Sequence, residues 1–135
     1  MLVIKPRAVA AGLTGRIIAD VERAGFRLLD VTSRVLTREE AERFYDVHRG
    51  QYFFEALIDF MTSGLSVAVL LEAADALSRL REYVGATDPG EAAPGTLRAS
   101  YGETQRKNAV HASDSAERAA AESAIYFGGG STADR

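Results

Sequence analysis

The chemistry that this sequence could carry centres on its two histidines, His48 and His111. Histidine can accept a phosphoryl group, because one ring nitrogen attacks while a hydrogen bond fixes the other. His48 stands beside Asp46 and Arg49 on an expected helix, which favours a solvated or capping role. His111 follows an apolar pair at residues 109–110 and precedes an expected helix start, so it could be held at a strand end within reach of a ligand.

Basic side chains that could bind an anion flank the segment between residues 85 and 107, and one more ends the first expected strand. They are Arg79, Arg81, Arg98 and Lys107, with Lys5 at the strand end. Arginine suits phosphate because its planar fork donates two parallel hydrogen bonds. A solvated basic surface is the alternative, and the loop context favours phosphate binding for Arg81 and Arg98. No Walker A motif and no GxGxxG after a strand occurs, so a phosphate site must be built from side chains.

Length and composition restrict the class of protein. The 135 residues predict one domain, and the 47% hydrophobic and 26% charged fractions are those of a soluble globular protein. A net charge of −3 disfavours a dedicated nucleic-acid binder. The lack of cysteine excludes disulfides, thiolate metal sites and a thiol nucleophile. The early charge of Lys5 is not typical of a signal peptide, and no apolar run reaches membrane length, so we expect a cytoplasmic protein with no membrane partner.

The elements that must position these side chains begin with a short buried strand at residues 2–4, which Pro6 ends. Apolar residues at helical spacing then predict a helix from about residue 12 to residue 24, with Gly25 at its C-terminal end. Residues 26–36 alternate between apolar and polar types and predict a half-exposed strand.

The middle of the chain predicts two helices, a strand and a further helix. Thr37 to Glu40 form a capping box that opens a helix, which Gly50 ends. A second short helix is expected from Phe53 to Met61, a buried strand over residues 65–71, and a helix over residues 73–84.

The last third begins with an irregular loop at residues 85–107, whose length suggests a functional role. A brief apolar pair follows, and then a helix to about Phe127 with Asp114 as N-cap and Glu117 at its third position. The order of elements predicts an α/β (α+β) fold of the ferredoxin-like split βαβ kind, with a four-stranded antiparallel sheet covered by helices and a long irregular loop before His111. We expect one domain over residues 1–127 and a flexible Gly-rich tail at 128–135.

Residues 108–115, Asn-Ala-Val-His-Ala-Ser-Asp-Ser, resemble the active-site signature of the nucleoside diphosphate kinase family, which usually reads Asn-x-x-His-Gly-Ser-Asp-Ser. Three further blocks resemble that family in the same order: Val-Ile-Lys-Pro at 3–6, the Phe-Phe-Glu-Ala-Leu and Thr-Ser-Gly runs within 53–64, and the loop within 85–98. The resemblance covers at least residues 1–127.

The resemblance implies an enzyme that passes the γ-phosphate of a nucleoside triphosphate such as ATP to a diphosphate such as GDP, by a ping-pong cycle through phospho-His111 and with broad base specificity. Glu122 would orient His111 through a hydrogen bond. Phe53 would stack on the base, and Leu57 would line the same slot. Ser113 would add hydrogen-bond donors near the transferred group.

The other residues that the resemblance assigns are polar contacts to phosphates and ribose: Lys5, Tyr45, Arg81, Thr87, Arg98 and Asn108. Lys5 and Asn108 would lie near the ribose 3′-hydroxyl and the transferred phosphate, and Lys5, Asn108 and Tyr45 are included among the catalytic residues. Arg81, Thr87 and Arg98 would hold the phosphates. Mg²⁺ would arrive on the nucleotide rather than in a protein cage.

The resemblance also implies a homo-oligomer, with a hexamer favoured over a tetramer. The sequence departs from the usual family pattern at Arg7-Ala8, Tyr52, Leu65-Ser66, Arg106-Lys107 and Ala112, none of which removes a catalytic side chain. A non-catalytic nucleotide-binding relative is the main alternative. The presence of the whole set of candidate site residues argues against it, and the net charge disfavours a nucleic-acid-binding role.

Overall fold

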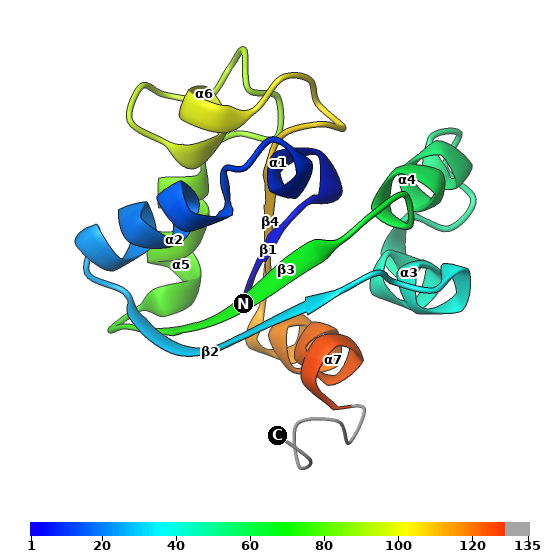
Figure 1. The fold of residues 1–135 in the computed structure, drawn as a ribbon, viewed down its shortest axis with the longest axis horizontal. Helices are drawn as coiled ribbons and strands as arrows, with labels where there is room; N and C mark the ends of the chain where they lie inside the picture. The colour runs from blue at the N-terminus through cyan, green and yellow to red at the C-terminus, as the bar shows by residue number, and fades with distance from the viewer. Residues whose placement is uncertain (129–135) are drawn as a thin grey trace.

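The computed structural model describes residues 1–128 and contains the predicted four-stranded antiparallel sheet, in the order β2-β3-β1-β4 (Figure 1). The strands are β1 (Leu2–Ile4), β2 (Arg27–Arg34), β3 (Ser66–Glu72) and β4 (Val110–Ala112). Val3 lies opposite Ala68 on β3 and opposite His111 on β4. All three β1 residues are fully buried, because this apolar run is paired on both sides and covered on both faces.

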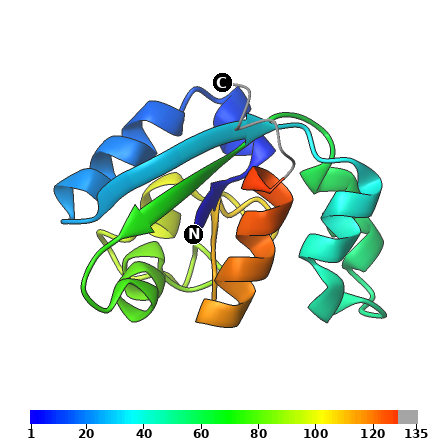
Figure 2. The ribbon, with the colours of Figure 1, turned by 90° about the horizontal axis from the view of Figure 1, so that it is seen from below.

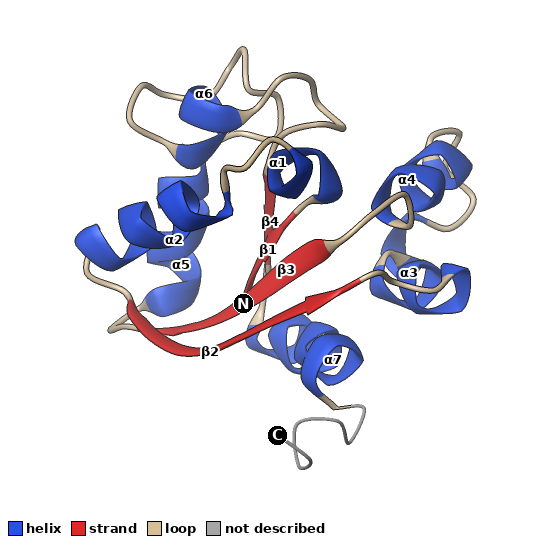
Figure 3. Cartoon of the chain, in the orientation of Figure 1, coloured by secondary structure: helices blue, strands red, loops and turns tan. Residues whose placement is uncertain are grey.

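Helices cover the two faces of the sheet (Figures 1 and 3). They are α1 (Pro6–Ala10), α2 (Thr14–Arg23), α3 (Arg38–Phe44), the 3₁₀ turn η1 (Asp46–His48), α4 (Phe54–Met61), α5 (Ala76–Val84), α6 (Leu97–Tyr101) and α7 (Ala116–Phe127). None of these helices, within residues 1–128, is long and apolar enough to cross a membrane.

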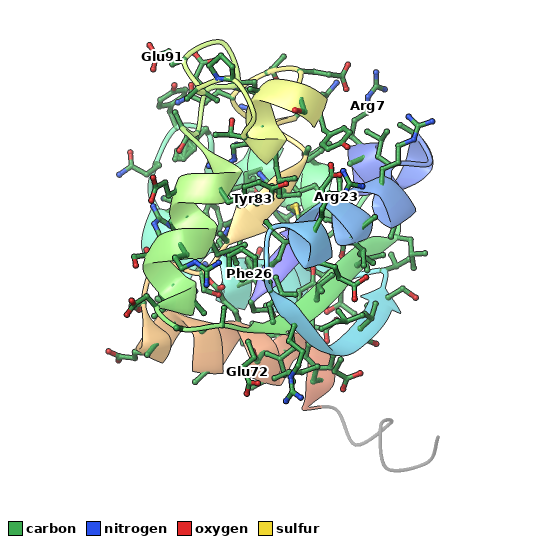
Figure 4. All side chains as sticks on the ribbon, turned by 90° about the vertical axis from the view of Figure 1, so that its left-hand side faces the viewer. Arg7, Arg23, Phe26, Glu72, Tyr83 and Glu91 are labelled. Atoms are coloured by element: carbon green, nitrogen blue, oxygen red, sulfur yellow. The ribbon has the colours of Figure 1, made fainter. Side chains whose placement is uncertain are left out.

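The alternation of β1 side chains divides the core into two clusters. Leu2 and Ile4 pack with residues of α1, α2 and α5 on one face, whereas Val3 packs with residues of α3, α4 and α7 on the other. Figure 2 shows α3 and α7 together on one side of the strands, with α2 on the other. On the α2–α5 side the rings of Phe26 and Tyr83 pack with their centroids 6.4 Å apart (Figure 4).

Two short helices were not predicted. Pro6 was expected only to end the first strand, yet it also occupies the first turn of α1, where its fixed φ suits a helix and its missing N–H costs no hydrogen bond. The helix predicted from residue 12 starts at Thr14 instead. The loop at residues 85–107 contains α6, whose N-cap Thr96 accepts a hydrogen bond from the Ala99 amide.

The N-cap prediction for the last helix was wrong by one residue. Ser115, in extended conformation, accepts the Arg118 amide hydrogen through its side chain, and Glu117 lies in the first turn. Asp114 therefore precedes the cap. The capping box of α3 is confirmed, with Thr37 and Glu40 bonding to each other's backbone amides. Of the predicted flexible tail at 128–135, residues 129–135 lie outside the part that the structure describes.

Candidate active site

A cavity of about 490 Å³ opens where β1, β4, the α3–α4 segment and the loop after α5 meet. Ten of the side chains that the sequence suggested gather at this site, and nine of them line the cavity: Lys5, Tyr45, Phe53, Leu57, Arg81, Thr87, Arg98, Asn108 and His111. Glu122 is the tenth and lies behind His111, buried on α7. The fold thus brings together side chains that are more than one hundred positions apart in the sequence.

His111 is held at the centre of β4 by contacts on several sides. The ring of Phe44 packs edge-on against the imidazole at 4.8 Å between centroids, and the ring of Tyr45 does so at 5.9 Å. The side chain of His111 keeps 21% of its surface exposed. Burial lowers the pKa of His111, although the hydrogen bond and charge of Glu122 oppose that shift. The imidazole is therefore fixed in place, reachable and mainly neutral near neutral pH.

The Nε2 atom of His111 lies 3.0 Å from Oε1 of Glu122. The same carboxylate oxygen accepts the Ser113 hydroxyl at 2.7 Å, and Arg118 Nη2 lies 3.6 Å from Oε2. Burial alone would raise the pKa of Glu122, but its bonds to His111 and Ser113 and the charge of Arg118 lower it. An ionised Glu122 accepts a hydrogen bond from the Nε2–H of His111, and this tautomer leaves a lone pair on Nδ1.

Ser113 and two basic side chains differ from the expectations drawn from the sequence. Ser113 is buried and donates to Glu122, so its hydroxyl supports the histidine from behind instead of adding a donor near a transferred group. Arg79 lies outside the cavity, over the ring of Phe26 and bonded to the carbonyl of Ala24. Lys107 lines a second cavity of about 370 Å³, not this one.

Four cations line the cavity without an acidic partner among residues 1–128: Lys5, Arg81, Arg98 and Arg106. The Lys5 ammonium donates to the Arg106 carbonyl at 3.4 Å, and burial together with the charge of Arg98 lowers the pKa of Lys5 to about 7. Burial and the charge of Arg81 lower the pKa of Arg98 to about 10. Positive groups that are partly desolvated and repel each other favour binding of a polyanion.

The loops hold two of these cations through backbone carbonyls. Arg98 donates to the carbonyls of Gly85 at 2.9 Å and Val110 at 3.0 Å. Arg81 donates to the carbonyl of Ala112 at 3.4 Å. The guanidinium groups are therefore tied to the loop and to β4, next to His111.

Polar atoms of the cavity walls are buried without a hydrogen-bond partner among the described residues. They are the Tyr45 hydroxyl, the Asn108 Oδ1 and the Arg98 Nε. The other end of the Asn108 side chain donates to the Thr87 carbonyl at 2.9 Å, which fixes the amide. Buried polar groups are nearly always paired in folded proteins, so these atoms are suited to a polar ligand.

His48 lines the cavity, which the sequence did not suggest. Its ring stacks on Tyr45 at 6.2 Å and meets Phe53 edge-on at 5.3 Å, so the predicted solvated or capping role was wrong. The sequence contained one indication of this contact, because Tyr45 and His48 are three residues apart. In the 3₁₀ turn η1 residues at this spacing lie on the same side, so the two rings meet. Tyr52, Gln105, Arg106, Ala112 and Asp114 complete the lining.

Comparison with known proteins identifies the family to which the chain belongs. The family model described as nucleoside diphosphate kinase matches residues 1–131. The chain belongs to the nucleoside diphosphate kinase family. A nucleoside diphosphate kinase of Psychromonas ingrahamii is 50% identical over 93% of this chain and 87% of its own length, and one of Chlorobium luteolum is 46% identical over 94% and 91%.

Solved nucleoside diphosphate kinases share the fold. The enzyme of Aquifex aeolicus superposes with a TM-score of 0.90 at 42% identity, over 95% of this chain and 93% of that one. A halophilic enzyme of Halobacterium salinarum in complex with CDP gives a TM-score of 0.88 at 35% identity, over 93% and 84%. The protein is thus a nucleoside diphosphate kinase, which transfers the γ-phosphate of a nucleoside triphosphate to a diphosphate through a phosphohistidine, by a ping-pong mechanism.

Of the departures from the family's sequence pattern, Tyr52, Arg106 and Ala112 line the cavity, and the others lie outside it. Arg7 pairs with Glu103 at 2.7 Å on the surface. Leu65 is 42% exposed and lines the second cavity. Ala112 is buried in β4 directly after His111, and Tyr52 is almost fully exposed.

Proposed function

We propose that His111 is the residue that carries the phosphoryl group and that its Nδ1 atom is the nucleophile. The single observation that carries this is the contact of Nε2 with Glu122, because it leaves Nδ1 as the nitrogen with a free lone pair. Nδ1 attacks the γ-phosphorus, the bond from phosphorus to the β,γ-bridging oxygen breaks, and the diphosphate leaves with that electron pair. An incoming diphosphate then attacks phospho-His111 through a terminal oxygen and restores the imidazole.

The side chains around His111 supply charge and position, which are what phosphoryl transfer chiefly requires. We assign Lys5, Arg81 and Arg98 to the phosphates, since they line the cavity as cations without an acidic partner among residues 1–128. Tyr45 and Asn108 present unpaired buried oxygens to the same space. Tyr45 would donate its hydroxyl hydrogen to a phosphate oxygen. The Oδ1 of Asn108 would accept a hydrogen bond from a ribose hydroxyl or a protonated group.

The base would lie in the slot formed by Phe53 and Leu57. Phe53 is half-buried at the start of α4, and Leu57 follows one turn later on the same face. Stacking on an aromatic face tolerates every base, because each has a π-surface. Thr87, exposed on the loop after α5, would hold a phosphate oxygen together with Arg81.

Mg²⁺ would be bound through the nucleotide phosphates. Within residues 1–128 no group of three histidine or carboxylate side chains is arranged to hold a metal ion, and Asp114 is the sole carboxylate that lines the cavity. Such a lining fits an ion that keeps water and phosphate ligands. Bound Mg²⁺ would neutralise phosphate charge alongside Lys5, Arg81 and Arg98.

We also propose a homo-oligomer, with a hexamer favoured over a tetramer. Strand β2 is an edge of the sheet, and Leu29 within it and Val35 just after it expose 46% and 56% of their surfaces. An edge strand with exposed apolar side chains is suited to association with another chain. Sedimentation equilibrium would give the mass of the assembly, and a monomer at micromolar concentration would contradict this proposal.

A phosphoenzyme assay tests the central proposal. The protein and the variants His111→Ala and His48→Ala are incubated with γ-labelled ATP and Mg²⁺ without an acceptor, then chased with GDP. We expect base-stable, acid-labile label on the wild type and His48→Ala, and its transfer to GTP in the chase. Label on His111→Ala, or its absence from the wild type while nucleotide still binds, would contradict the role of His111.

Two expectations from the sequence stay predictions. They are a cytoplasmic location and the absence of dedicated nucleic-acid binding. Cell fractionation would test the first, and filter binding at moderate salt would test the second.

A further inference from the structure

A row of aromatic rings runs along one wall of the cavity, from His111 to its mouth. The centroid of His111 lies 5.9 Å from that of Tyr45, which stacks on His48 at 6.2 Å. His48 meets Phe53 at 5.3 Å, and Phe53 meets Tyr52 at 5.5 Å. The four ring contacts lead from the reacting nitrogen to a tyrosine at the far end. Tyr52 thus extends the aromatic wall beyond the side chain assigned to base stacking.

Tyr52 is unusual because its large side chain lines the cavity while remaining 98% exposed. The segment that carries it lies between η1 and α4, at the outer end of the α3–α4 pair (Figure 1). Its ring stands at 85° to the ring of Phe53. The two rings therefore form a corner at the mouth of the cavity.

A base that lies flat on Phe53 would meet the ring of Tyr52 edge to face. Aromatic groups favour both stacked and edge-to-face arrangements at centroid separations of about 4.5–7 Å. Gln105 and Arg106, which also line the cavity, come from the loop after α6 and are polar. The apolar surface available to a base is thus provided by Phe53, Leu57 and Tyr52.

We propose that Tyr52 makes a second aromatic contact to the bound base and thereby favours purines over pyrimidines among the nucleotides that the enzyme accepts. A purine has two fused rings, so a base centred on Phe53 reaches further toward Tyr52 than a single pyrimidine ring does. The contact adds to the broad acceptance of bases and does not replace it, since the slot reads no base edge. This inference rests on the proposed placement of the base on Phe53.

Steady-state kinetics with different acceptors would test the inference. We would measure kcat/KM for GDP, ADP, CDP, UDP and base-free ribose 5-diphosphate with ATP as donor, for wild type, Tyr52→Ala and Tyr52→Phe. Val47→Ala is the matched control, because Val47 is also apolar and 65% exposed nearby but does not line the cavity. One aromatic contact predicts that Tyr52→Ala lowers kcat/KM for GDP and ADP by about two- to tenfold. The kcat/KM of Tyr52→Ala should fall less for CDP and UDP, and it should not change for ribose 5-diphosphate. Tyr52→Phe and Val47→Ala should have the wild-type kcat/KM for every acceptor.

The ratio of purine to pyrimidine kcat/KM decides the outcome. A ratio that is the same in wild type and Tyr52→Ala would overturn the inference, and so would an equal loss for all acceptors including ribose 5-diphosphate. A failure of the proposed function would look different, because the wild type would then form no labelled phosphoenzyme on His111 with any donor. Tyr52 is exposed, so its variants should keep the wild-type melting temperature, which a thermal melt would verify.

Discussion

Glu122 holds His111 and Ser113 through one carboxylate oxygen, at 3.0 Å from the imidazole Nε2 and 2.7 Å from the hydroxyl oxygen. Ser113 also donates toward the carbonyl of Met1 at 3.3 Å, next to β1. The orientation of the imidazole thus depends on a carboxylate that is anchored on α7 and braced against the central strands. Such a chain of buried contacts limits the rotation of His111 before any nucleotide binds.

Replacing Glu122 with glutamine should slow phosphorylation of His111 about ten- to a hundredfold. The amide can donate to Nε2 and so move the imidazole proton to Nδ1, which removes the lone pair that attacks. Rapid-quench measurement of phosphoenzyme formation at saturating ATP would report this step. Glu117→Gln is the control, because Glu117 is exposed on the first turn of the same helix. An unchanged rate for Glu122→Gln would show that the carboxylate does not set the tautomer.

Nucleotide binding should weaken as pH rises above about 7, the value to which burial and Arg98 lower the pKa of Lys5. Above that pH the free protein holds Lys5 neutral, whereas a bound phosphate raises its pKa, so binding must take up a proton. The affinity should then fall by up to about tenfold per pH unit until the pKa of the bound form is reached. The terminal phosphate has its second pKa near 6, so it contributes little in this range.

Calorimetry of ADP binding to His111→Ala in two buffers of different ionisation enthalpy would measure that proton. About one proton should be taken up at pH 8. In the further variant Lys5→Met binding should be weaker at pH 6 and nearly independent of pH above 7. Persistence of the pH slope in Lys5→Met would assign it to another group.

The fold could be predicted from the sequence wherever a continuous apolar run or a helical period of several turns was present. The apolar runs at residues 2–4 and 65–71 gave two central strands, because an element buried on both faces is apolar throughout. The five-residue helices α1 and α6 are too short to show helical periodicity, so local caps decide them.

The site was predictable in a different way. From residue types alone, His111 and a few cations were candidates, and the resemblance supplied the rest. The role of Ser113 could not be read from its place near His111, because its direction depends on where α7 packs against β1. His48 was missed for the same reason, since a 3₁₀ turn places its ring between two others.

Removing the Tyr45 hydroxyl should lower the activity of the enzyme without lowering its stability. Burial raises the pKa of Tyr45 well above its ordinary value, so the phenol keeps its hydrogen. This hydroxyl has no partner among residues 1–128, and Tyr45→Phe should therefore leave the free energy of unfolding unchanged or raise it by about 1 kcal/mol. The value of kcat/KM should fall about tenfold, the effect of one hydrogen bond to a charged phosphate.

Urea unfolding and steady-state kinetics on Tyr45→Phe would check both parts. Tyr126→Phe is the matched control, because the Tyr126 hydroxyl is buried and bonded to Ser66 at 2.8 Å. That change should cost about 1–3 kcal/mol of stability, with little direct effect on turnover. A loss of stability in Tyr45→Phe without loss of activity would contradict its assignment to the phosphates.

The conformation of Gly85 positions Arg98, so Gly85→Ala should weaken both the fold and nucleotide binding. Gly85 has φ +91°, and its carbonyl accepts from Arg98 at 2.9 Å. An added Cβ would lie 2.6 Å from Thr96 Oγ1, which forces the loop to move. Backbone strain and overpacking together should lower the free energy of unfolding by about 2–4 kcal/mol, and ADP should bind at least several-fold more weakly because Arg98 loses one of its two carbonyl anchors. Gly95→Ala is the matched control, since Gly95 has φ +89° in the same loop but no atom within 4 Å of an added Cβ. Gly95→Ala should lower the free energy of unfolding by about 1 kcal/mol, from backbone strain alone, and should keep the wild-type affinity for ADP. Equal ADP affinities of the two variants, measured by calorimetry, would show that the Gly85 carbonyl does not position Arg98.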